Sequence, residues 1–276
     1  MVIIMKVLLL SHSPNPEKVV AAAAKLCYAN AAPDELYDGL TEEKAAGFVE
    51  RLASYGHESP IEHATFTFAI EGVSRSLLAE ITRHRIATFS VQSQRYVKKS
   101  EVSVVTPPEI EAIPEAKALF EQTIQTEWKA YNDLADLLQD KHYRTFLAEG
   151  RSEKQARLDA EKKAIEDARF VLPNACTTNM MVTMNARSLY NFFRQRCCNR
   201  AQWEIRAVAT EMLRLVTEVA PTLFAGAGPR CFKGGCTEGA KSCGRAAEVR
   251  KAFEELHAGA RVRYDERRAA SDVGEE

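Results

Sequence analysis

The sequence lacks two features that would identify whole classes of protein. No apolar run approaches the roughly 18 residues that a membrane-spanning helix requires, so we expect no membrane partner. The 37 Lys and Arg residues are balanced by 38 Asp and Glu residues, which leaves a net charge of −1. Such a chain has no overall basic excess with which to bind nucleic acid. We therefore expect no nucleic-acid partner, and a local cluster of positive charge would instead indicate a small anionic ligand.

The lack of a signal-peptide cleavage site and of a disulfide framework bears on the cellular location of the protein. The apolar N-terminus is interrupted by Lys6 and followed by Pro14 and Pro16, without a small-residue cleavage site. We therefore expect a buried strand over residues 2–10 and no signal peptide. The seven cysteines are an odd number, and two of them are adjacent. This does not suit a disulfide framework and favours a reducing, cytoplasmic location.

Hydrophobic periodicity predicts the elements of the fold. Ala64, Phe66, Phe68 and Ile70 alternate with Thr65 and Thr67, which is typical of a half-buried strand. Further strands are expected over residues 102–108 and 176–185. Helices are expected over residues 17–28, 41–54, 74–83, 109–169 (with a break at Gly150), 185–198 and 201–219. Because strands and helices mix without regular alternation, we expect an α+β fold with a mixed or antiparallel sheet and flanking helices in a single domain.

The composition of the chain changes after residue 224. The segment "AGAGPRCFKGGCTEGAKSCG" is rich in glycine and cysteine, and the charged end that follows is expected to be frayed. Residues 1–224 would then form the main domain and residues 225–276 a Cys- and Gly-rich, charged extension. Its three cysteines could bind zinc with a fourth ligand such as His257, but the spacing lacks the paired C-x-x-C of strong zinc sites. We expect no metal there and favour free or redox-active thiols.

One arginine of the expected helix over 185–198 lies on its apolar face. At about 100° per residue, Leu189, Phe192 and Phe193 share one side, and Arg196 falls in the middle of it. An unpaired guanidinium there would cost several kcal/mol, so Arg196 needs an anion or several acceptors. Three interpretations remain open: a bound ligand, a carboxylate of another element of the chain, or a side chain at the helix end whose stem packs on the apolar face while its charged group reaches solvent.

Positive charge also gathers in "TRHRIATFSVQSQRYV", residues 82–97, which contains three arginines and a histidine but no acid. In an extended segment Arg83 and Arg85 lie on the same side. Two guanidiniums match the geometry of a phosphate group, and Ser90 and Ser93 would add hydroxyl donors. The alternative is a solvated basic loop without a ligand.

The same segment contains a recognisable motif. It reads Arg83-His84-Arg85, then seven residues, then Ser93 and Arg95-Tyr96. Upstream lies "YGHESPIEHATFTF", and downstream "ARFVLPNACTTNMMVTMNARSLYNFFRQRCCNRAQWEIR". These three blocks, in this order, resemble those of the flavin-dependent thymidylate synthases, and the resemblance covers roughly residues 1–224. Members of that family methylate dUMP to dTMP.

The resemblance implies a set of ligands and an assembly. The carbon would come from 5,10-methylenetetrahydrofolate and the reducing equivalents from NADPH through FAD, in a homotetramer with active sites at subunit interfaces. By position, FAD would be held by Ser59, Arg83, His84, Arg85, Val91, Asn185, Arg187 and Asn191. The nucleotide dUMP would be held by Glu80, Arg83, Ser93, Gln94, Arg95, Arg169 and Arg196.

The resemblance also implies catalytic roles for Arg196 and His57. Arg196 would lie against the uracil ring and favour its ionised form, and His57 would lie near the flavin and assist folate binding or carbon transfer. Two positions depart from the family: Glu80 replaces a frequent glutamine, and Val91 stands where some members have an acid or amide. An acid beside a phosphate or a uracil carbonyl would repel it unless the acid pairs with an arginine or takes a proton.

Alternatives exist for Ser93 and for the whole protein. Ser93 could act as a nucleophile, but no sequence pattern shows the base that would activate it, so we favour a phosphate-binding role without an enzyme nucleophile. The protein could instead be a nucleotide- or RNA-binding module without redox chemistry. It could also be an NADPH oxidase that has lost nucleotide specificity through Glu80.

Overall fold

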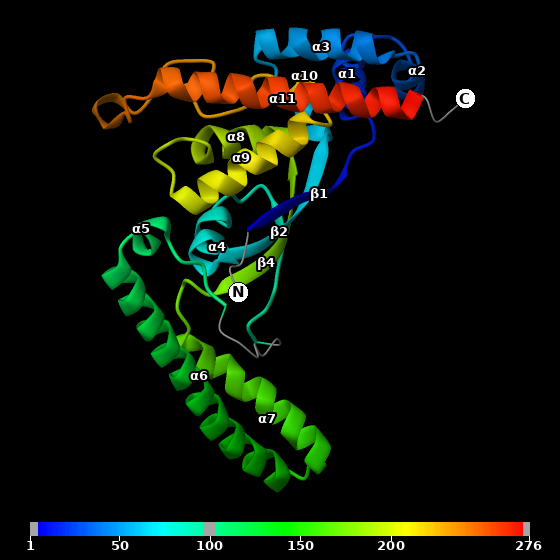
Figure 1. Cartoon of the computed structure of the whole chain (residues 1–276). Helices are drawn as coiled ribbons and strands as arrows, with labels where there is room; N and C mark the ends of the chain where they lie inside the picture. The colour runs from blue at the N-terminus through cyan, green and yellow to red at the C-terminus, as the bar shows by residue number, and fades with distance from the viewer. Residues whose placement is uncertain (1–4, 96–102, 273–276) are drawn as a thin grey trace. The chain divides into compact units, whose positions relative to one another are not determined.

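The structure is a computed structural model that describes residues 5–95 and 103–272 (Figure 1). The remaining residues lie outside this description. They include Tyr96 of the arginine-rich motif, the first residues of the strand expected over 2–10, and residue 102 of the strand expected over 102–108.

Four strands form one sheet in the order β1-β2-β4-β3. They are β1 (Lys6–His12), β2 (Thr65–Ser74), β3 (Thr88–Val91) and β4 (Thr177–Asn185). The Thr67 and Thr183 hydroxyls are 2.9 Å apart, and the Gly72 N–H donates to Asn179 Oδ1 at 3.0 Å. Residue numbers rise along β2 as they fall along β4, so the two strands are antiparallel. The predicted α+β fold with an antiparallel sheet is confirmed.

The chain passes between two compact units. The first unit consists mainly of Glu71–Ala79 and Val91–Met180, and the second of Lys6–Ile70, Glu80–Ser90 and Met181–Glu276. Strands β2 and β4 each run from one unit into the other, so neither unit is a separate continuous segment of the chain. Because neither unit is a continuous half of the chain, the prediction of a single α+β domain is confirmed.

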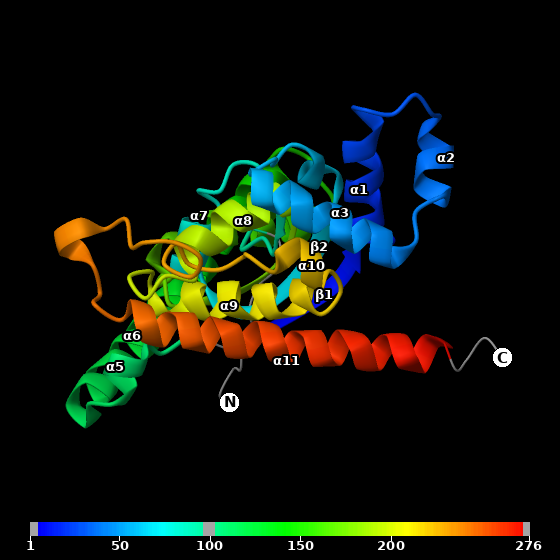
Figure 2. The ribbon, with the colours of Figure 1, turned by 90° about the horizontal axis from the view of Figure 1, so that it is seen from above.

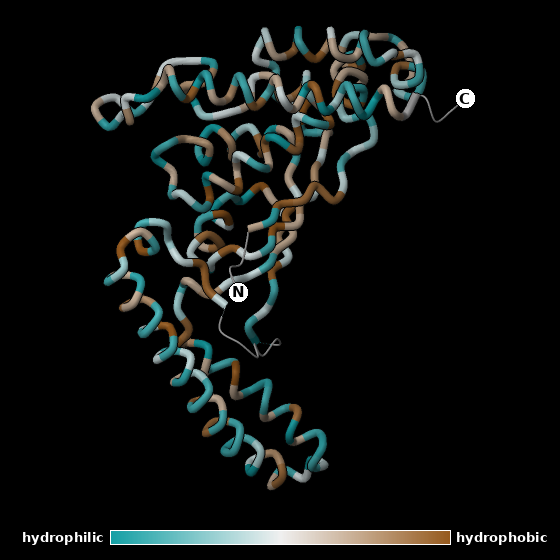
Figure 3. Tube along the Cα trace, in the orientation of Figure 1, coloured by the Kyte–Doolittle hydropathy of each residue, from teal (hydrophilic) through white to brown (hydrophobic). Residues whose placement is uncertain are grey.

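The first unit contains a long helical hairpin. Its helices are α6 (Pro114–Ala148) and α7 (Glu153–Ala168), preceded by α5 (Pro108–Glu111) and followed by the 3-10 turn η2 (Arg169–Val171). The predicted break at Gly150 is confirmed, with a φ of 86° that favours glycine. Apolar residues recur along both helices between hydrophilic ones (Figure 3), and Tyr131, Ala135, Ile165 and Ala168 form their buried contact. The strand expected over 102–108 is not formed by its described residues, because Val104 makes only an isolated bridge to Cys176.

The second unit holds most of the other helices. They are α1 (Pro16–Leu26), α2 (Pro33–Asp38), α3 (Glu42–Tyr55), η1 (Pro60–His63), α8 (Ala186–Arg196), α9 (Trp203–Thr217), α10 (Pro221–Phe224), η3 (Gly239–Lys241) and α11 (Ala246–Asp272). Helix α4 (Arg75–Ile81) spans the boundary in the chain between the units. None of the helices in the described ranges is long and apolar enough to cross a membrane.

The core of the second unit lies on the predicted face of β2. Ala64, Phe66, Phe68 and Ile70 are fully buried, as their alternation predicted. The ring of Phe224 lies edge-on to that of Phe66, with centroids 5.2 Å apart. It also contacts the rings of Phe193 and Tyr190, at 6.3 and 5.8 Å. These aromatic contacts hold α8 and α10 against the strand.

The C-terminal helix α11 corrects the expectation of a frayed end. Val249, Phe253 and Ala260 recur at helical spacing and are buried, and α11 packs along α9 (Figure 2). The buried carboxylate of Glu218 accepts hydrogen bonds from Arg263 and other arginines, which lie on both helices. A charged sequence can thus form an ordered helix when its few apolar residues share one face.

Candidate functional site

Helix α8 directs Arg196 inward, as the helical geometry predicted. The side chain of Asn185 caps the helix by accepting a hydrogen bond from the Ser188 N–H at 2.8 Å. Phe192 and Phe193 are fully buried on the inner face. The Arg196 side chain is only 19% exposed, whereas those of the other two arginines of the helix are about half exposed.

The guanidinium of Arg196 is held by α4 and the segment that follows it. Its Nη1 donates to Glu80 Oε2 at 3.0 Å, its Nη2 to the Glu80 carbonyl at 3.4 Å, and its Nε to His84 Nε2 at 3.1 Å. Of the interpretations of Arg196 left open by the sequence, the structure shows the carboxylate of another element. An acid at position 80 was expected to need an arginine partner or a proton, and Glu80 pairs with Arg196. Three of the five guanidinium N–H groups are used in these bonds, which leaves two for another acceptor.

His84 is a neutral acceptor in this arrangement. Its half-buried ring lies edge-on to Phe192, with centroids 4.9 Å apart. Burial, and secondarily the charge of Arg196, lowers the pKa of His84 to about 4. Because Nε2 accepts the bond from Arg196, we assign the ring proton to Nδ1. A neutral histidine orients the guanidinium without cancelling its charge.

This pKa shift predicts a contribution of His84 to the pH dependence of stability. The folded-state pKa of about 4 lies below the ordinary value of 6.5, so the unfolded chain takes up the proton first as the pH falls. The stabilising contribution is complete above pH 6.5 and is lost progressively as the pH falls to about 4. We expect urea unfolding midpoints to fall more steeply across this window in the wild type than in His84→Gln, which retains an acceptor for Arg196. Equal slopes would show that His84 titrates normally in the folded chain.

A pocket of about 360 Å³ opens beside Arg196, and we call it the arginine pocket. Among the described residues, its lining contains three guanidiniums and no carboxylate: Arg83, His84, Arg85, Ile86, Met184, Ser188, Asn191, Gln195 and Arg196. Within the described part of the chain, Arg83 and Arg85 form no ion pair. A pocket with several guanidiniums and amide groups matches the oxygen atoms of phosphates. This donor set fits the anionic part of a nucleotide or dinucleotide such as FAD.

The structure brings together only some of the residues expected to bind FAD. Arg187 lies outside the arginine pocket and pairs with Glu62 and with Glu58, the latter at 3.4 Å. Ser59 precedes η1, and Val91 ends β3. Ser59, Val91 and Asn185 do not line the pocket. Its members from the set expected to bind FAD are Arg83, His84, Arg85 and Asn191, and Arg196 joins them from the set expected to bind the nucleotide.

His57 stands at the end of α3. Gly56 ends that helix with a φ of 69°, and the His57 N–H then donates to the Leu52 carbonyl at 3.1 Å. The His57 side chain is exposed, and its ring lies 5.9 Å from that of Tyr55. The backbone of His57 is therefore fixed while its imidazole remains accessible.

Three of the other expected nucleotide-binding residues, Ser93, Arg95 and Arg169, form a second cluster in the first unit. Arg95 pairs with Glu166 at 2.8 Å, and Arg169 Nε donates to the Glu166 carbonyl at 3.0 Å. Burial, and then the charge of Arg169, lowers the pKa of Arg75. The Ser93 hydroxyl accepts the Arg95 N–H at 3.1 Å. This cluster therefore also carries a local excess of positive charge.

Two residues of the arginine pocket were missed by the sequence analysis. Ser188 and Gln195 line the pocket with Asn191, and Gln195 donates to Asn191 Oδ1 at 2.9 Å. Their spacing of three and four residues places all three on one side of α8. This polar stripe beside Arg196 was available in the sequence as a signal.

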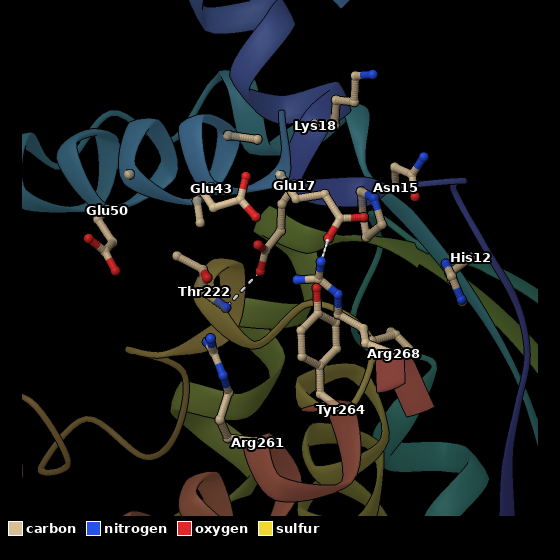
Figure 4. Close-up of a pocket in the computed structure, with 16 residues that line it drawn as sticks. His12, Asn15, Glu17, Lys18, Glu43, Glu50, Thr222, Arg261, Tyr264 and Arg268 are labelled. Atoms are coloured by element: carbon tan, nitrogen blue, oxygen red, sulfur yellow. Dashed lines mark hydrogen bonds and ion pairs between the residues drawn. The ribbon is translucent and has the colours of Figure 1, made fainter. Parts of the chain in front are cut away.

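A second pocket, of about 500 Å³, lies among α1, α3, α10 and α11 (Figure 4). Glu17 accepts the N–H groups of Thr222 and Leu223 at 2.6 and 2.9 Å, and its burial raises its pKa. Arg268 pairs with Glu42 at 2.7 Å. These charges are engaged in contacts between helices, and none of the expected site residues lines this pocket.

Comparisons with known proteins identify relatives of this chain. The family described as thymidylate synthase complementing protein matches residues 8–222. The flavin-dependent thymidylate synthase of Clostridium tetani is 54% identical over 248 residues, which cover 90% of this chain and 96% of that protein. The enzyme of the same name from Geobacter sulfurreducens is 46% identical over 254 residues, 91% of this chain and 99% of that one. The chain therefore belongs to the flavin-dependent thymidylate synthase family.

Proposed function

We propose that the protein catalyses the FAD-dependent reductive methylation of dUMP to dTMP. In this reaction 5,10-methylenetetrahydrofolate is the carbon donor and NADPH is the reductant. The observation that carries the proposal is the arginine pocket, whose lining among the described residues contains Arg83, Arg85 and Arg196 but no acid. Arg196 is already paired with Glu80, and the phosphates of dUMP and FAD would balance the charges of Arg83 and Arg85.

We propose that FAD is bound by residues of the arginine pocket and of the segments beside it. Bound FAD supplies the reducing equivalents for the new methyl group. Arg83, His84, Arg85 and Asn191 are the proposed contacts supported by the pocket lining. Ser59, Val91, Asn185 and Arg187 remain proposed contacts on the resemblance alone, and Arg187 would have to leave Glu58 and Glu62 to contribute its charge.

We propose that dUMP is bound by Glu80, Arg83, Ser93, Gln94, Arg95, Arg169 and Arg196. Arg196 is proposed to donate its two remaining N–H groups toward the uracil ring and to favour the ring's ionised form. Glu80 would then act through Arg196, because its carboxylate accepts from Nη1 and fixes the guanidinium. This role explains how an acid is accommodated at position 80.

Other parts of the proposal concern folate and the assembly. His57 is proposed to assist folate binding or carbon transfer, which its exposed imidazole permits. We propose that residues 1–224 form the catalytic domain of a cytoplasmic homotetramer with active sites at subunit interfaces. Among the described residues, each unit holds a positive cluster with more arginines than paired acids, which supports sites completed by another copy.

One assay separates this function from its rivals. The purified protein should show a flavin spectrum, and thymidylate should form only when FAD, NADPH, methylenetetrahydrofolate and dUMP are all present. A protein that stays colourless after incubation with FAD would favour a nucleotide- or RNA-binding module. Flavin reduction by NADPH without tritium release from labelled dUMP would indicate an NADPH oxidase.

The replacement Ser93→Ala tests the role of the Ser93 hydroxyl. We expect KM for dUMP to rise by about 10-fold, because one hydrogen bond to a charged group is lost, while kcat stays within a few-fold of the wild type. Steady-state kinetics with dUMP as the varied substrate would measure both. Complete loss of product in a single turnover at saturating dUMP would instead identify Ser93 as a nucleophile.

A further inference from the structure

Helix α6 of the first unit has one face that its partner helix leaves uncovered. Its buried residues, Tyr131 and Ala135 among them, pack against α7. Leu119 and Leu137 lie away from that contact and are 64% and 69% exposed, and Leu134 is 36% exposed. Single exposed leucines are common on protein surfaces, but several at helical spacing on one helix form a surface for another molecule.

The exposed leucines belong to a continuous stripe without charge. At about 100° per residue and about 1.5 Å of rise, the stripe covers roughly 80° of the helix surface over a length of about 27 Å. We call it the seam, and it consists of Leu119, Thr123, Thr126, Ala130, Leu134 and Leu137. Its residues recur at steps of three and four, as the contact positions of paired helices do. No charged residue of α6 falls within this stripe.

The seam matches a second copy of itself when the two helices run in opposite directions. If Leu119 of one copy faces Leu137 of the other, then Thr126 of one faces Ala130 of the other. Large side chains meet at both ends of this contact and small ones in the middle, where the helix axes can approach closely. The contact uses the same surface on both copies, as a two-fold axis requires.

The charges beyond each end of the seam favour the same antiparallel arrangement. Before the seam, residues 109–117 contain three glutamates and one lysine; after it, residues 140–144 contain one aspartate, one lysine and one arginine. Glu115, Lys141 and Arg144 form no ion pair with any residue that the structure describes. In the antiparallel register Glu115 lies across from Lys141, so the acidic start of each helix meets the basic end of the other. A parallel pair would bring like charges together.

We propose that a second copy of this chain binds to the seam, with the two α6 helices packed antiparallel about a two-fold axis. None of the residues expected to bind FAD or dUMP lies on α6, so this surface is separate from the sites already described. The contact would be one interface of the proposed homotetramer, and in this respect the inference rests on the proposed function. It adds the surface that makes the interface and the direction in which the helices run.

Replacing the two leucines at the ends of the seam by glutamate tests the contact. We expect the wild type to have the mass of a tetramer in solution. The double variant Leu119→Glu/Leu137→Glu should have the mass of a dimer, because each contact would bring glutamates together. Leu158→Glu is the matched control and should keep the wild-type mass, since Leu158 is a 46% exposed leucine of α7 outside the seam. Size-exclusion chromatography with light scattering would measure all three masses.

The outcomes separate this proposal from the proposed reaction. A tetramer that persists in the double variant would overturn the seam contact, and so would a monomeric wild type. Thymidylate formation is assayed on the same wild-type preparation. If no thymidylate forms although the mass halves in the double variant, the seam contact stands and the proposed reaction fails.

Disulfide cross-linking keeps the test decisive if the double glutamate variant fails to fold. On mild oxidation, Leu119→Cys/Leu137→Cys should form a disulfide between position 119 of one copy and position 137 of another, identified by mass spectrometry of its peptides. Leu119→Cys alone should not link two copies through position 119, because these positions lie about 27 Å apart in the antiparallel register. A disulfide between two copies of position 119, or none between positions 119 and 137, would overturn the proposal.

Discussion

The replacement Arg196→Ala is expected to lower kcat for thymidylate formation by about 10²–10³-fold while the purified protein keeps its flavin. The proposed role of Arg196 is to stabilise negative charge that develops on the uracil ring, and the loss of one such donor has an effect of this size. Flavin binding would persist because Arg83, Arg85 and Asn191 still line the pocket. Single-turnover product formation and the flavin spectrum would measure the two effects.

Arg194→Ala is the matched control for this replacement. Arg194 belongs to the same helix, but its side chain is exposed and lies 3.3 Å from Glu58. We expect its loss to change kcat by no more than about twofold, because exposed ion pairs contribute little. A wild-type rate in Arg196→Ala would refute the proposed mechanism. Loss of flavin in that variant would instead indicate that Arg196 mainly compensates Glu80.

The replacement Phe224→Ala is expected to lower the free energy of unfolding by about 3–5 kcal/mol. Phe224 is fully buried, and its ring contacts those of Phe66, Tyr190 and Phe193. Removing it would leave a cavity where α8 and α10 meet β2. Since a domain is stable by only about 5–15 kcal/mol, much of the stability would be lost. Urea unfolding followed by circular dichroism would measure the change.

Phe170→Ala is the control that removes an aromatic ring from an exposed position. Phe170 is 82% exposed, so its removal should change the unfolding free energy by less than about 0.5 kcal/mol. Similar losses in both variants would mean that the aromatic cluster around Phe224 is not a packed core.

The parts of the fold and site that the sequence predicted correctly depend on local periodicity. The alternation through Ala64–Ile70 identified the buried face of β2, and the helical spacing of Leu189, Phe192 and Phe193 identified that of α8. The same spacing placed Arg196 on the inner side. In each case several apolar residues repeat with one period, so tertiary packing and local pattern agree.

The predictions that failed concern short or sparsely apolar elements and residues that pair across long stretches of sequence. Strand β3 has only four residues, all exposed or half-buried, so no alternation marked it within residues 82–97. The buried face of α11 consists of a few apolar residues in a charged segment, which suggested fraying instead. The partner of Arg196 could not be predicted, because Glu80 lies 116 residues away and only the folded chain brings the two together.

The hairpin of α6 and α7 has a consequence for the order of folding. Strands β2 and β4 pair across long stretches of sequence, since Thr67 and Thr183 are 116 residues apart. The hairpin lies within this stretch, and its contacts are local, so it can form before the strands meet. Once formed, the hairpin roughly halves the length of flexible chain between the two strands. This lowers the free-energy cost of closing the loop by about 0.6 kcal/mol. Early hairpin formation would therefore accelerate the pairing of the central strands.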